Sequence, residues 1–451
     1  MKKILATILA LVLALGLTAT VWAEGDGTAS GSMTGADFLA KAKDGVITLT
    51  DDVTLSTSCS ISDSNAYTIN LNGKTLSAAK QVISLTRGKV IVNGTGTIKE
   101  SAPYLGAIVI KGSVNSAETN YSVVEVNAGV ILEGWAPIFV DQNAAKAYGV
   151  SVTVNGATLN ARKDTTGDGG AGIYVNGQIT DENNAPVISL TNTKICDVDN
   201  ASQGMYLAGY TTTTLTNCDI TGMTGVEIRA GKLTVSGGAI TGTATPVTVT
   251  PNGNGSTTAG AGVALAQHTT KLPVIVTIEN ATVKGYTGVY ESNPQNNDPA
   301  SIAKVNLTIS GGNFEAINNG TNAVYSEDCT NFISGGTFSS DVSAYAGNNA
   351  VASLKNVYYV GTDSIEAAVN SMSGGDTLTV IKGSVKVGNT EYGENQTYTK
   401  PTSYYYYSPS TTTPDTTTKG SPKTFDAGVS IYAVTAVLSV TGMAWTAKKR
   451  H

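Results

Sequence analysis

Short stretches of alternating apolar and polar residues run along most of the chain, and many of them repeat one eight-residue pattern. Its clearest early copy is INLNGKTL, which begins at Ile69. The third place of every copy is apolar, at Leu71, Val154, Leu190, Leu215, Val235, Ile278, Ile309 and Ile333. Apolar residues at every second position are typical of a strand with one face in a core. The pattern therefore predicts many short strands.

The fifth place of every copy is glycine or asparagine. These residues stand at Gly73, Gly156, Asn192, Asn217, Gly237, Asn280, Gly311 and Gly335. Glycine and asparagine enter the left-handed region of φ at the lowest cost. We therefore expect each unit to consist of a strand, a sharp corner at this position, and a second strand.

The spacing of the copies indicates a stacked architecture. From Val152 onward, successive copies begin 36, 25, 20, 43, 31 and 24 residues apart. This is one unit of about 20 to 25 residues, lengthened in places by inserted loops. One such unit has too little surface to bury its own apolar face, whereas stacked units form a continuous core.

Over roughly residues 45 to 360, the chain resembles the right-handed parallel β-helix of the pectin-lyase-like superfamily. We therefore expect an all-β solenoid of about fourteen coils at ~4.8 Å each, closed by short capping helices. The sequences ADFLAKAK, from Ala36, and SIEAAVNSM, from Ser364, have the helical patterns that suit such caps. A β-sandwich or a row of immunoglobulin-like domains is the alternative, but these folds need longer strands and hairpins.

Both chain ends carry patterns of export. Lys2 and Lys3 precede an apolar stretch that reaches Leu17, and small residues near Ala23 suit a signal peptidase. At the other end, a mostly apolar run from Val429 to Trp445 is followed by Lys448, Lys449 and Arg450. A basic cluster of this kind stays on the cytoplasmic side of a membrane.

The pentad before that run is Ser421, Pro422, Lys423, Thr424 and Phe425. With the apolar run and the basic end, it resembles the sorting signal of Gram-positive surface proteins. A sortase cuts such a signal after the threonine of Leu-Pro-x-Thr-Gly and joins the protein to peptidoglycan. Pro422 and Thr424 match this motif, whereas Ser421 and Phe425 replace its leucine and glycine. The departures imply a divergent sortase, and an ordinary C-terminal membrane tail is the alternative.

These observations divide the chain into six segments. We expect a signal peptide, a linker, a β-helix with its N-terminal cap, a C-terminal cap or small module, a wall-spanning linker and a sorting signal, at residues 1–23, 24–35, 36–360, 361–398, 399–420 and 421–451. The wall-spanning linker is rich in Thr, Ser, Pro and Tyr and too poor in aliphatic residues to fold. The membrane is then a partner only through the tail before sorting.

Composition limits the partners. The formal charge is −6, and basic clusters occur only at the two ends, so we expect no nucleic-acid partner. The four cysteines lack metal-binding spacing, and we predict neither a metal site nor a cofactor. Cys59 alternates with apolar neighbours and should point inward. A bridge between Cys196 and Cys218 stays open, although the repeat puts them on different faces.

Candidate catalytic groups are few, and we assign no catalytic residue. The chain lacks the Asn-Thr-Asp, Gly-His-Gly and Arg-Ile-Lys motifs of β-helix hydrolases. Asp197 and Asp199 share one strand face, and Asp219 is a candidate third carboxylate for hydrolysis, but solvated outer-face side chains are the simpler interpretation.

The other candidate groups also have simple structural interpretations. Asp164 and Asp168 resemble half a calcium loop or a glycine-rich turn. We expect a surface ion pair for Glu227 and Arg229, and a solvated loop position for His268.

The leading functional hypothesis is a wall-attached surface rod that acts as an adhesin or binds glycans or host matrix. Inserted loops of solenoids gather on binding faces, so residues 161–187, 250–272 and 290–304 are the expected recognition surfaces. Two alternatives remain, a wall-bound polysaccharide lyase or glycoside hydrolase and a structural spacer without a ligand.

Overall fold

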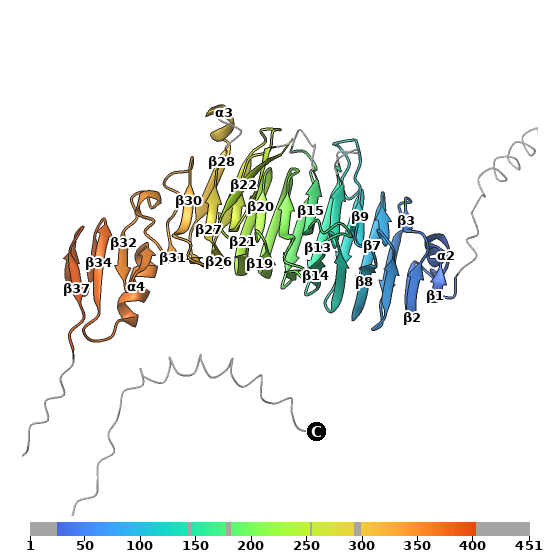
Figure 1. The fold of residues 1–451 in the computed structure, drawn as a ribbon, viewed down its shortest axis with the longest axis horizontal. Helices are drawn as coiled ribbons and strands as arrows, with labels where there is room; N and C mark the ends of the chain where they lie inside the picture. The colour runs from blue at the N-terminus through green and yellow to red at the C-terminus, as the bar shows by residue number, and fades with distance from the viewer. Residues whose placement is uncertain (1–24, 142–146, 177–181, 253–254, 293–298, 403–451) are drawn as a thin grey trace, which may run out of the picture. The chain divides into compact units, whose positions relative to one another are not determined.

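The computed structural model describes residues 25–141, 147–176, 182–252, 255–292 and 299–402. These residues belong to one compact unit that ends at Thr402. Its strands lie side by side from β1 (Thr28–Met33) to β37 (Thr397–Thr399), as Figure 1 shows, and the short helix α2 (Gly35–Ala40) follows β1. Strands predominate and the helices are short, so the prediction of an all-β chain is confirmed.

Most strands fall into three columns, and within a column each strand pairs in parallel with the next. Column 1 contains β4 (Ala66–Asn70), β7 (Gly88–Asn93), β10 (Ser122–Val126), β13 (Val150–Asn155), β16 (Val187–Thr191), β25 (Val274–Ile278) and β28 (Val305–Ile309). Column 2 contains β5 (Thr75–Ala78), β8 (Gly96–Glu100), β11 (Val130–Gly134), β14 (Thr158–Ala161), β17 (Lys194–Asp197), β26 (Ala281–Gly285), β29 (Gly312–Ala316) and β31 (Gly336–Phe338). Three longer strands run through both columns, namely β2 (Val46–Leu55), β19 (Thr211–Gly222) and β21 (Gly231–Gly242).

Column 3 is a separate sheet of ten parallel strands. They are β3 (Cys59–Ile61), β6 (Ile83–Leu85), β9 (Ile108–Ile110), β12 (Ile138–Asp141), β15 (Ala171–Asn176), β18 (Gln203–Leu207), β20 (Val226–Ile228), β24 (Ala261–Leu265), β27 (Thr287–Glu291) and β30 (Asn322–Ser326). We call one strand from each column, taken in chain order, a rung. Ten strands fall short of the expected fourteen coils, because inserted loops lengthen most rungs beyond 25 residues.

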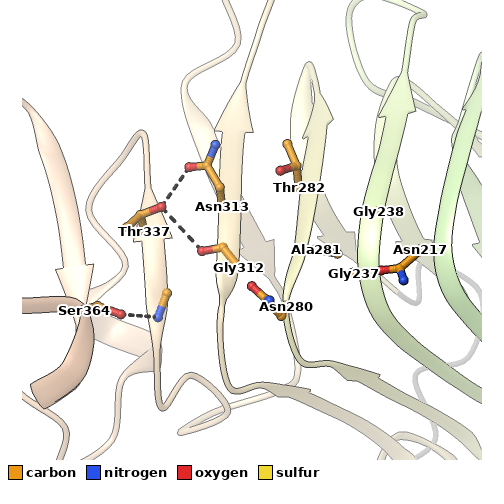
Figure 2. A pocket seen from close by; sticks show the side chains of 11 residues that line it. Asn217, Gly237, Gly238, Asn280, Ala281, Thr282, Gly312, Asn313, Thr337 and Ser364 are labelled. Carbon is orange, nitrogen blue, oxygen red and sulfur yellow. Dashed lines mark hydrogen bonds between the residues drawn. The ribbon is translucent and has the colours of Figure 1, made fainter. Parts of the chain in front are cut away.

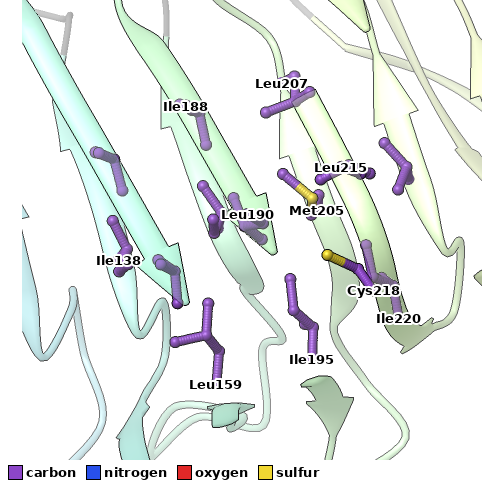
Figure 3. Packing of buried hydrophobic residues seen from close by; sticks show 14 of the residues in the cluster. Ile138, Leu159, Ile188, Leu190, Ile195, Met205, Leu207, Leu215, Cys218 and Ile220 are labelled. Atoms are coloured by element: carbon purple, nitrogen blue, oxygen red, sulfur yellow. The ribbon is translucent and has the colours of Figure 1, made fainter. Parts of the chain in front are cut away.

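The core lies between the columns and consists of aliphatic rows. The third-place residue of the repeat is buried in all eight copies. Seven of these eight residues form one continuous row from Val154 to Ile333, while Leu71 lies beside the row in a longer corner. Figure 3 shows Leu190 and Leu215 of this row facing Met205 and Leu207 of column 3. Each rung therefore buries side chains from all three columns against those of its neighbours.

The corner between columns 1 and 2 takes two forms. Gly73, Gly156, Asn192, Asn217 and Gly237 have the expected positive φ, between 49° and 76°. The last three repeats differ, since positive φ is absent at their fifth places, Asn280, Gly311 and Gly335. In the last two of them it occurs one residue later, at Gly312 and Gly336.

Two of those fifth places need glycine for a different reason. A Cβ at Gly311 would lie 2.5 Å from the carbonyl oxygen of Glu279, and a Cβ at Gly335 would meet the carbonyl of Ser310. At these two corners glycine permits close approach of neighbouring backbones.

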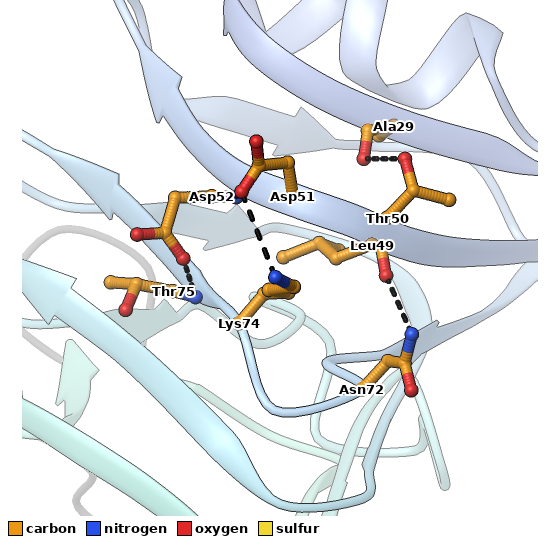
Figure 4. A network of polar contacts seen from close by, with 8 residues as sticks. All are labelled: Ala29, Leu49, Thr50, Asp51, Asp52, Asn72, Lys74 and Thr75. Carbon is orange, nitrogen blue, oxygen red and sulfur yellow. Dashed lines mark hydrogen bonds and ion pairs between the residues drawn. The ribbon is translucent and has the colours of Figure 1, made fainter.

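The first rungs are joined by polar contacts at their corners (Figure 4). The Asn72 side-chain amide donates to the Leu49 carbonyl at 3.1 Å, and the Thr75 amide donates to the Asp52 carboxylate at 2.8 Å. Lys74 lies 3.7 Å from Asp51. Side chains of one rung thus satisfy backbone groups of the next, which fixes their register.

The two ends of the stack are covered. At the N-terminal end, α2 begins after Thr34, whose hydroxyl accepts a hydrogen bond from the Asp37 amide, and Phe38 is fully buried. At the other end the strands become antiparallel. This part contains β32 (Val351–Leu354), β33 (Val357–Val360), α4 (Thr362–Ser371), β34 (Thr377–Lys382), β35 (Val385–Val387) and β36 (Thr390–Tyr392).

These C-terminal elements, with β37, share a small apolar cluster of their own, and we call them the C-terminal module. Among the described residues, no helix is long and apolar enough to cross a membrane.

Candidate functional site

Loops gather along both borders of column 3. Columns 1 and 2 are joined by very short corners, and β19 and β21 pass from one to the other without a break. Several connections on either side of column 3 are longer, and one of them holds the hairpin of β22 (Thr248–Asn252) and β23 (Gly255–Ala259). Another contains α3 (Pro299–Ile302). Because solenoid insertions collect around binding faces, column 3 is the place to look for a site.

One outward position of column 3 is occupied by a continuous row, which we call the column 3 row. In register it consists of Ser60, Ser84, Val109, Phe139, Tyr174, Tyr206, Glu227, Ala264, Tyr290 and Tyr325. Five of these ten residues are aromatic. Parallel strands lie ~4.8 Å apart, so neighbouring rings of such a row come into contact.

Four rings form a contiguous cluster at the middle of the row. The Tyr174 centroid lies 5.3 Å from that of Phe139, 4.9 Å from that of Tyr206 and 5.0 Å from that of Trp135. Trp135 comes from the connection before β12. Phe139 and Tyr206 are buried, whereas Trp135 and Tyr174 are half-buried and keep ring surface at the exterior. Aromatic rings that pack against the protein on one side and face solvent on the other are typical of binding surfaces.

Two further rings lie later in the row. Tyr290 and Tyr325 stack with centroids 5.1 Å apart and an interplanar angle of 19°, and Tyr325 is 36% exposed. The row thus offers two aromatic areas, separated by Glu227 and Ala264.

Between these areas lies a buried charged group rather than the surface ion pair that we expected. Glu227 and Arg229 are both completely buried. The Glu227 carboxylate accepts hydrogen bonds from the Gln203 side chain at 2.8 Å and from the Thr258 amide at 3.1 Å. Arg229 donates to the Tyr206 hydroxyl. Burial raises the pKa of Glu227 to about 7, although the Arg229 charge opposes the rise.

The hairpin explains this burial. Thr258, which binds Glu227, belongs to β23, and its carbonyl accepts a hydrogen bond from Thr224 at 2.6 Å. The backbone at Gly255 passes so close to Arg229 that a Cβ there would collide with the guanidinium. The hairpin therefore covers the two charges, which a strand with one solvated face would have left exposed.

His268 also differs from the expectation of a solvated loop residue. The residue is only 4% exposed, and its backbone amide donates to the Arg229 carbonyl at 2.8 Å. Burial, with the nearby Arg229 charge, lowers the pKa of His268 to about 4. The imidazole is therefore neutral at physiological pH.

The three candidate aspartates are not brought together. Asp219 is exposed and pairs in register with Lys194 of the neighbouring strand, which stands three residues before Asp197. Asp199 instead approaches Arg162 at 3.5 Å, and Arg162 also contacts Glu133 at 3.3 Å. Burial raises the pKa of Asp197, which is half-buried rather than fully solvated.

The segment from Asp164 to Asp168 is a tight turn. One Asp164 oxygen accepts hydrogen bonds from the Thr166 amide, the Thr166 hydroxyl and the Asp168 amide, at 2.7 to 2.9 Å. These bonds lower the pKa of Asp164. Over the described residues, no three His, Cys, Asp or Glu side chains converge as a metal site would require.

The four cysteines are free thiols in this structure. Cys59 is fully buried, so its predicted inward position is confirmed, and burial raises its pKa to about 12. Cys218 is also buried, and Cys196 is half-buried. The predicted sorting pentad, residues 421–425, and the predicted signal peptide, residues 1–23, lie outside the described residues.

Grooves elsewhere have different characters. The corner between columns 1 and 2 holds a groove of about 460 Å³ (Figure 2), and its lining is small and uncharged, for example Asn217, Gly237, Thr282 and Asn313. A second groove, of about 550 Å³, lies on the C-terminal module beside Ile365. Neither lining includes an aromatic ring.

Comparison with known proteins gives no assignment for the chain. No protein-family model matches it, and neither a curated protein nor a solved structure resembles it significantly. The site therefore has to be interpreted from its own residues.

Proposed function

We propose that this protein is an exported surface protein, that a sortase joins it to peptidoglycan, and that it binds glycans through the column 3 row. The anchoring part is supported by the order of the N-terminal apolar stretch, the pentad Ser421 to Phe425, the apolar run and the basic end. The protein is then displayed outside the cell as an adhesin or matrix-binding rod.

We further propose that the three columns form a right-handed parallel β-helix. Ten successive strands of column 3 pair in parallel, and the chain visits columns 1 and 2 between them. Connections between parallel strands of one sheet are overwhelmingly right-handed, because of the strand twist. A rod of ten such rungs is about 48 Å long at ~4.8 Å per rung.

One observation carries the binding part, namely that aromatic rings follow the outward row of the column that loops border on both sides. The apolar faces of sugar rings stack on aromatic side chains, and the strand repeat presents such rings at regular intervals. An extended glycan along the row would contact several of them together. Loops at the borders would supply the polar contacts.

Anchoring is tested by cell fractionation. A Thr424→Ala variant of the full-length protein removes the residue whose carbonyl a sortase attacks. We expect the wild-type protein in the wall fraction, released by a peptidoglycan hydrolase, and the variant in the membrane fraction or the medium. A Thr418→Ala variant in the preceding linker is the control and should behave as wild type. Equal wall attachment of the Thr424 variant would refute the sortase proposal.

Glycan binding is tested by exposing the full-length protein to an array of host and plant glycans. We expect retention of a defined subset. A structural spacer predicts no binding to any glycan, and a lyase or hydrolase predicts shortened products on prolonged incubation. Either outcome would replace the proposal with the corresponding alternative.

A further inference from the structure

A groove on the outer face of column 1 has a chemistry that neither of the other two grooves has. It measures about 630 Å³ and crosses four neighbouring strands, β4, β7, β10 and β13. In register, its floor runs through Ala66, Lys89, Val123 and Ser151. Tyr121 and Arg87 stand at its side, at the starts of β10 and β7. The groove lies on a different column from the column 3 row.

Arg87 is the notable residue of this groove. Its side chain is exposed, and its guanidinium lies over the Tyr121 ring at 5.6 Å from the centroid. Arg162 contacts two carboxylates and Arg229 is buried. Of the arginines in the described part of the chain, Arg87 alone is exposed and makes no ion pair with a described carboxylate.

The other charges of the groove leave Arg87 available to a ligand. Lys89 and Glu125 neutralise each other through an ion pair of 2.7 Å. Glu118 is an exposed residue of the lining loop. The surrounding polar groups are the hydroxyls of Ser64, Thr119 and Ser151 and the amide of Asn120. They are suited to the hydroxyl groups of a sugar.

We propose that this groove binds a sugar that carries a carboxylate, at the end of a glycan. The planar guanidinium of Arg87 pairs with the carboxylate through two parallel hydrogen bonds, and its stacking on Tyr121 holds it in place. The small floor residues Ala66 and Val123 accept the ring, and the hydroxyl-bearing residues contact its edge. A carboxylate is required, because a neutral sugar leaves the guanidinium without a partner.

This inference shares with the proposed function only the premise that the protein meets glycans outside the cell. Its site is separate, so the two can fail independently. Loss of binding in an Arg87 variant with an intact column 3 row identifies this groove. A Tyr174→Ala change on column 3 should leave the binding of carboxylated sugars here intact.

The test measures affinity of the purified full-length protein by titration calorimetry. The probes are sialyllactose, a disaccharide with a terminal glucuronate, sulfated lactose and lactose. The first two distinguish the sources of the carboxylate, and we expect at least one of them to bind while lactose does not. Arg87→Gln should abolish this binding, and Arg87→Lys should weaken it roughly tenfold or more, since the paired geometry is lost.

A matched charge control is available. Lys80 is exposed and lies over the Tyr104 ring at 4.6 Å, outside the groove. Lys80→Gln removes the same charge as Arg87→Gln and should leave affinity unchanged. The proposal would be overturned if lactose bound as tightly as the carboxylated probes, or if sulfated lactose alone bound. Absence of binding to every probe would also overturn it, as would unchanged affinity in both Arg87 variants.

Discussion

Tyr174 is the residue on which the proposed glycan contact most depends. It is half-buried and touches three other rings, so its ring both holds the cluster together and contributes exterior surface. Tyr174→Ala should abolish array binding of the glycans that lack a carboxylate and lower the unfolding free energy by about 2 kcal/mol, because apolar contact is lost on both sides. Array retention and thermal unfolding measure the two effects.

Tyr392→Ala is the aromatic control for this change. Tyr392 packs against Tyr398 in the C-terminal module, at 5.7 Å between centroids, and takes no part in column 3. Its removal should reduce stability without changing glycan retention. If the Tyr174 variant retains the same glycans as wild type, the column 3 row is not the binding surface.

Glu227 sets a pH dependence of stability. Its pKa rises from the ordinary 4.5 to about 7 on folding, so the folded state favours the protonated carboxyl. The stability that Glu227 contributes is complete below pH 4.5 and is lost as pH rises through about 7. His268 acts in the opposite direction, since its pKa falls from 6.5 to about 4 and its contribution is lost as pH falls. The two effects partly cancel in the wild-type protein.

A Glu227→Gln variant separates the pH-dependent contribution of Glu227 from that of His268. The amide keeps one acceptor for Thr258, and Gln203 can rotate to offer its own side-chain oxygen, which has no partner in this structure. We expect the melting temperature of the variant, relative to wild type, to rise between pH 5 and pH 8. Calorimetric scans at both pH values check this. A constant difference between the two proteins would show that Glu227 does not titrate in that window.

At the scale of elements, a stack of glycines allows columns 2 and 3 to approach closely. Gly172, Gly204, Gly225, Gly262 and Gly288 lie at the same level of five successive rungs in column 3, with Gly225 directly before β20. A Cβ at Gly172 would collide with Ile195 of column 2, and one at Gly204 would lie 2.5 Å from Ile220. Glycine is needed here for space, since none of the five has a positive φ.

Gly225→Ala tests this close packing. The added methyl group would lie 2.5 Å from the Gly262 carbonyl and would meet the Ile240 side chain. We expect a loss of about 1 to 3 kcal/mol in unfolding free energy, because the columns must separate to accept the methyl group. Gly393→Ala is the control, since its nearest neighbour is 3.9 Å away. Urea titrations compare the variants, and equal midpoints would contradict a packing role.

The elements also show which features the sequence can reveal. The repeat of columns 1 and 2 was predictable, because its apolar places alternate over eight residues and are buried in all eight copies. The repeat did not reveal column 3 as a third row of strands. Column 3 nevertheless has its own sequence signal, a glycine followed by apolar, aromatic and apolar residues, as in GIYV from Gly172 and GMYL from Gly204. Its strands are mostly three to six residues long, too short for alternation to stand out.

The wrong prediction of a surface ion pair for Glu227 and Arg229 has a different cause. Glu227 on β20 and Arg229 directly after it alternate as exposed residues do, and no local pattern indicates that a hairpin about 20 residues later returns to cover them. Contacts of this range arise from the tertiary structure, so residue patterns within one strand are insufficient to predict them.

At the scale of the whole molecule, a stack of rungs is stable only if its ends are closed. An open end exposes aliphatic rows and unpaired strand edges, which promote association between copies. Here α2 covers the first rungs through the fully buried Phe38, and the C-terminal module covers the last. Resistance to association between copies thus depends on a few residues at the ends.

Phe38→Ala should therefore change association more than it changes the central rungs. Removal of this ring costs about 3 to 5 kcal/mol in local packing, enough to release α2 and uncover the first strand edge. We expect concentration-dependent dimers or larger species by light scattering, while strand content by circular dichroism stays near wild type. Tyr104→Ala, which removes a ring that is 59% exposed, should remain unassociated. A strictly monomeric Phe38 variant would show that the N-terminal edge is protected by something other than α2, and a loss of all strand signal would show that the rungs unfold as one unit.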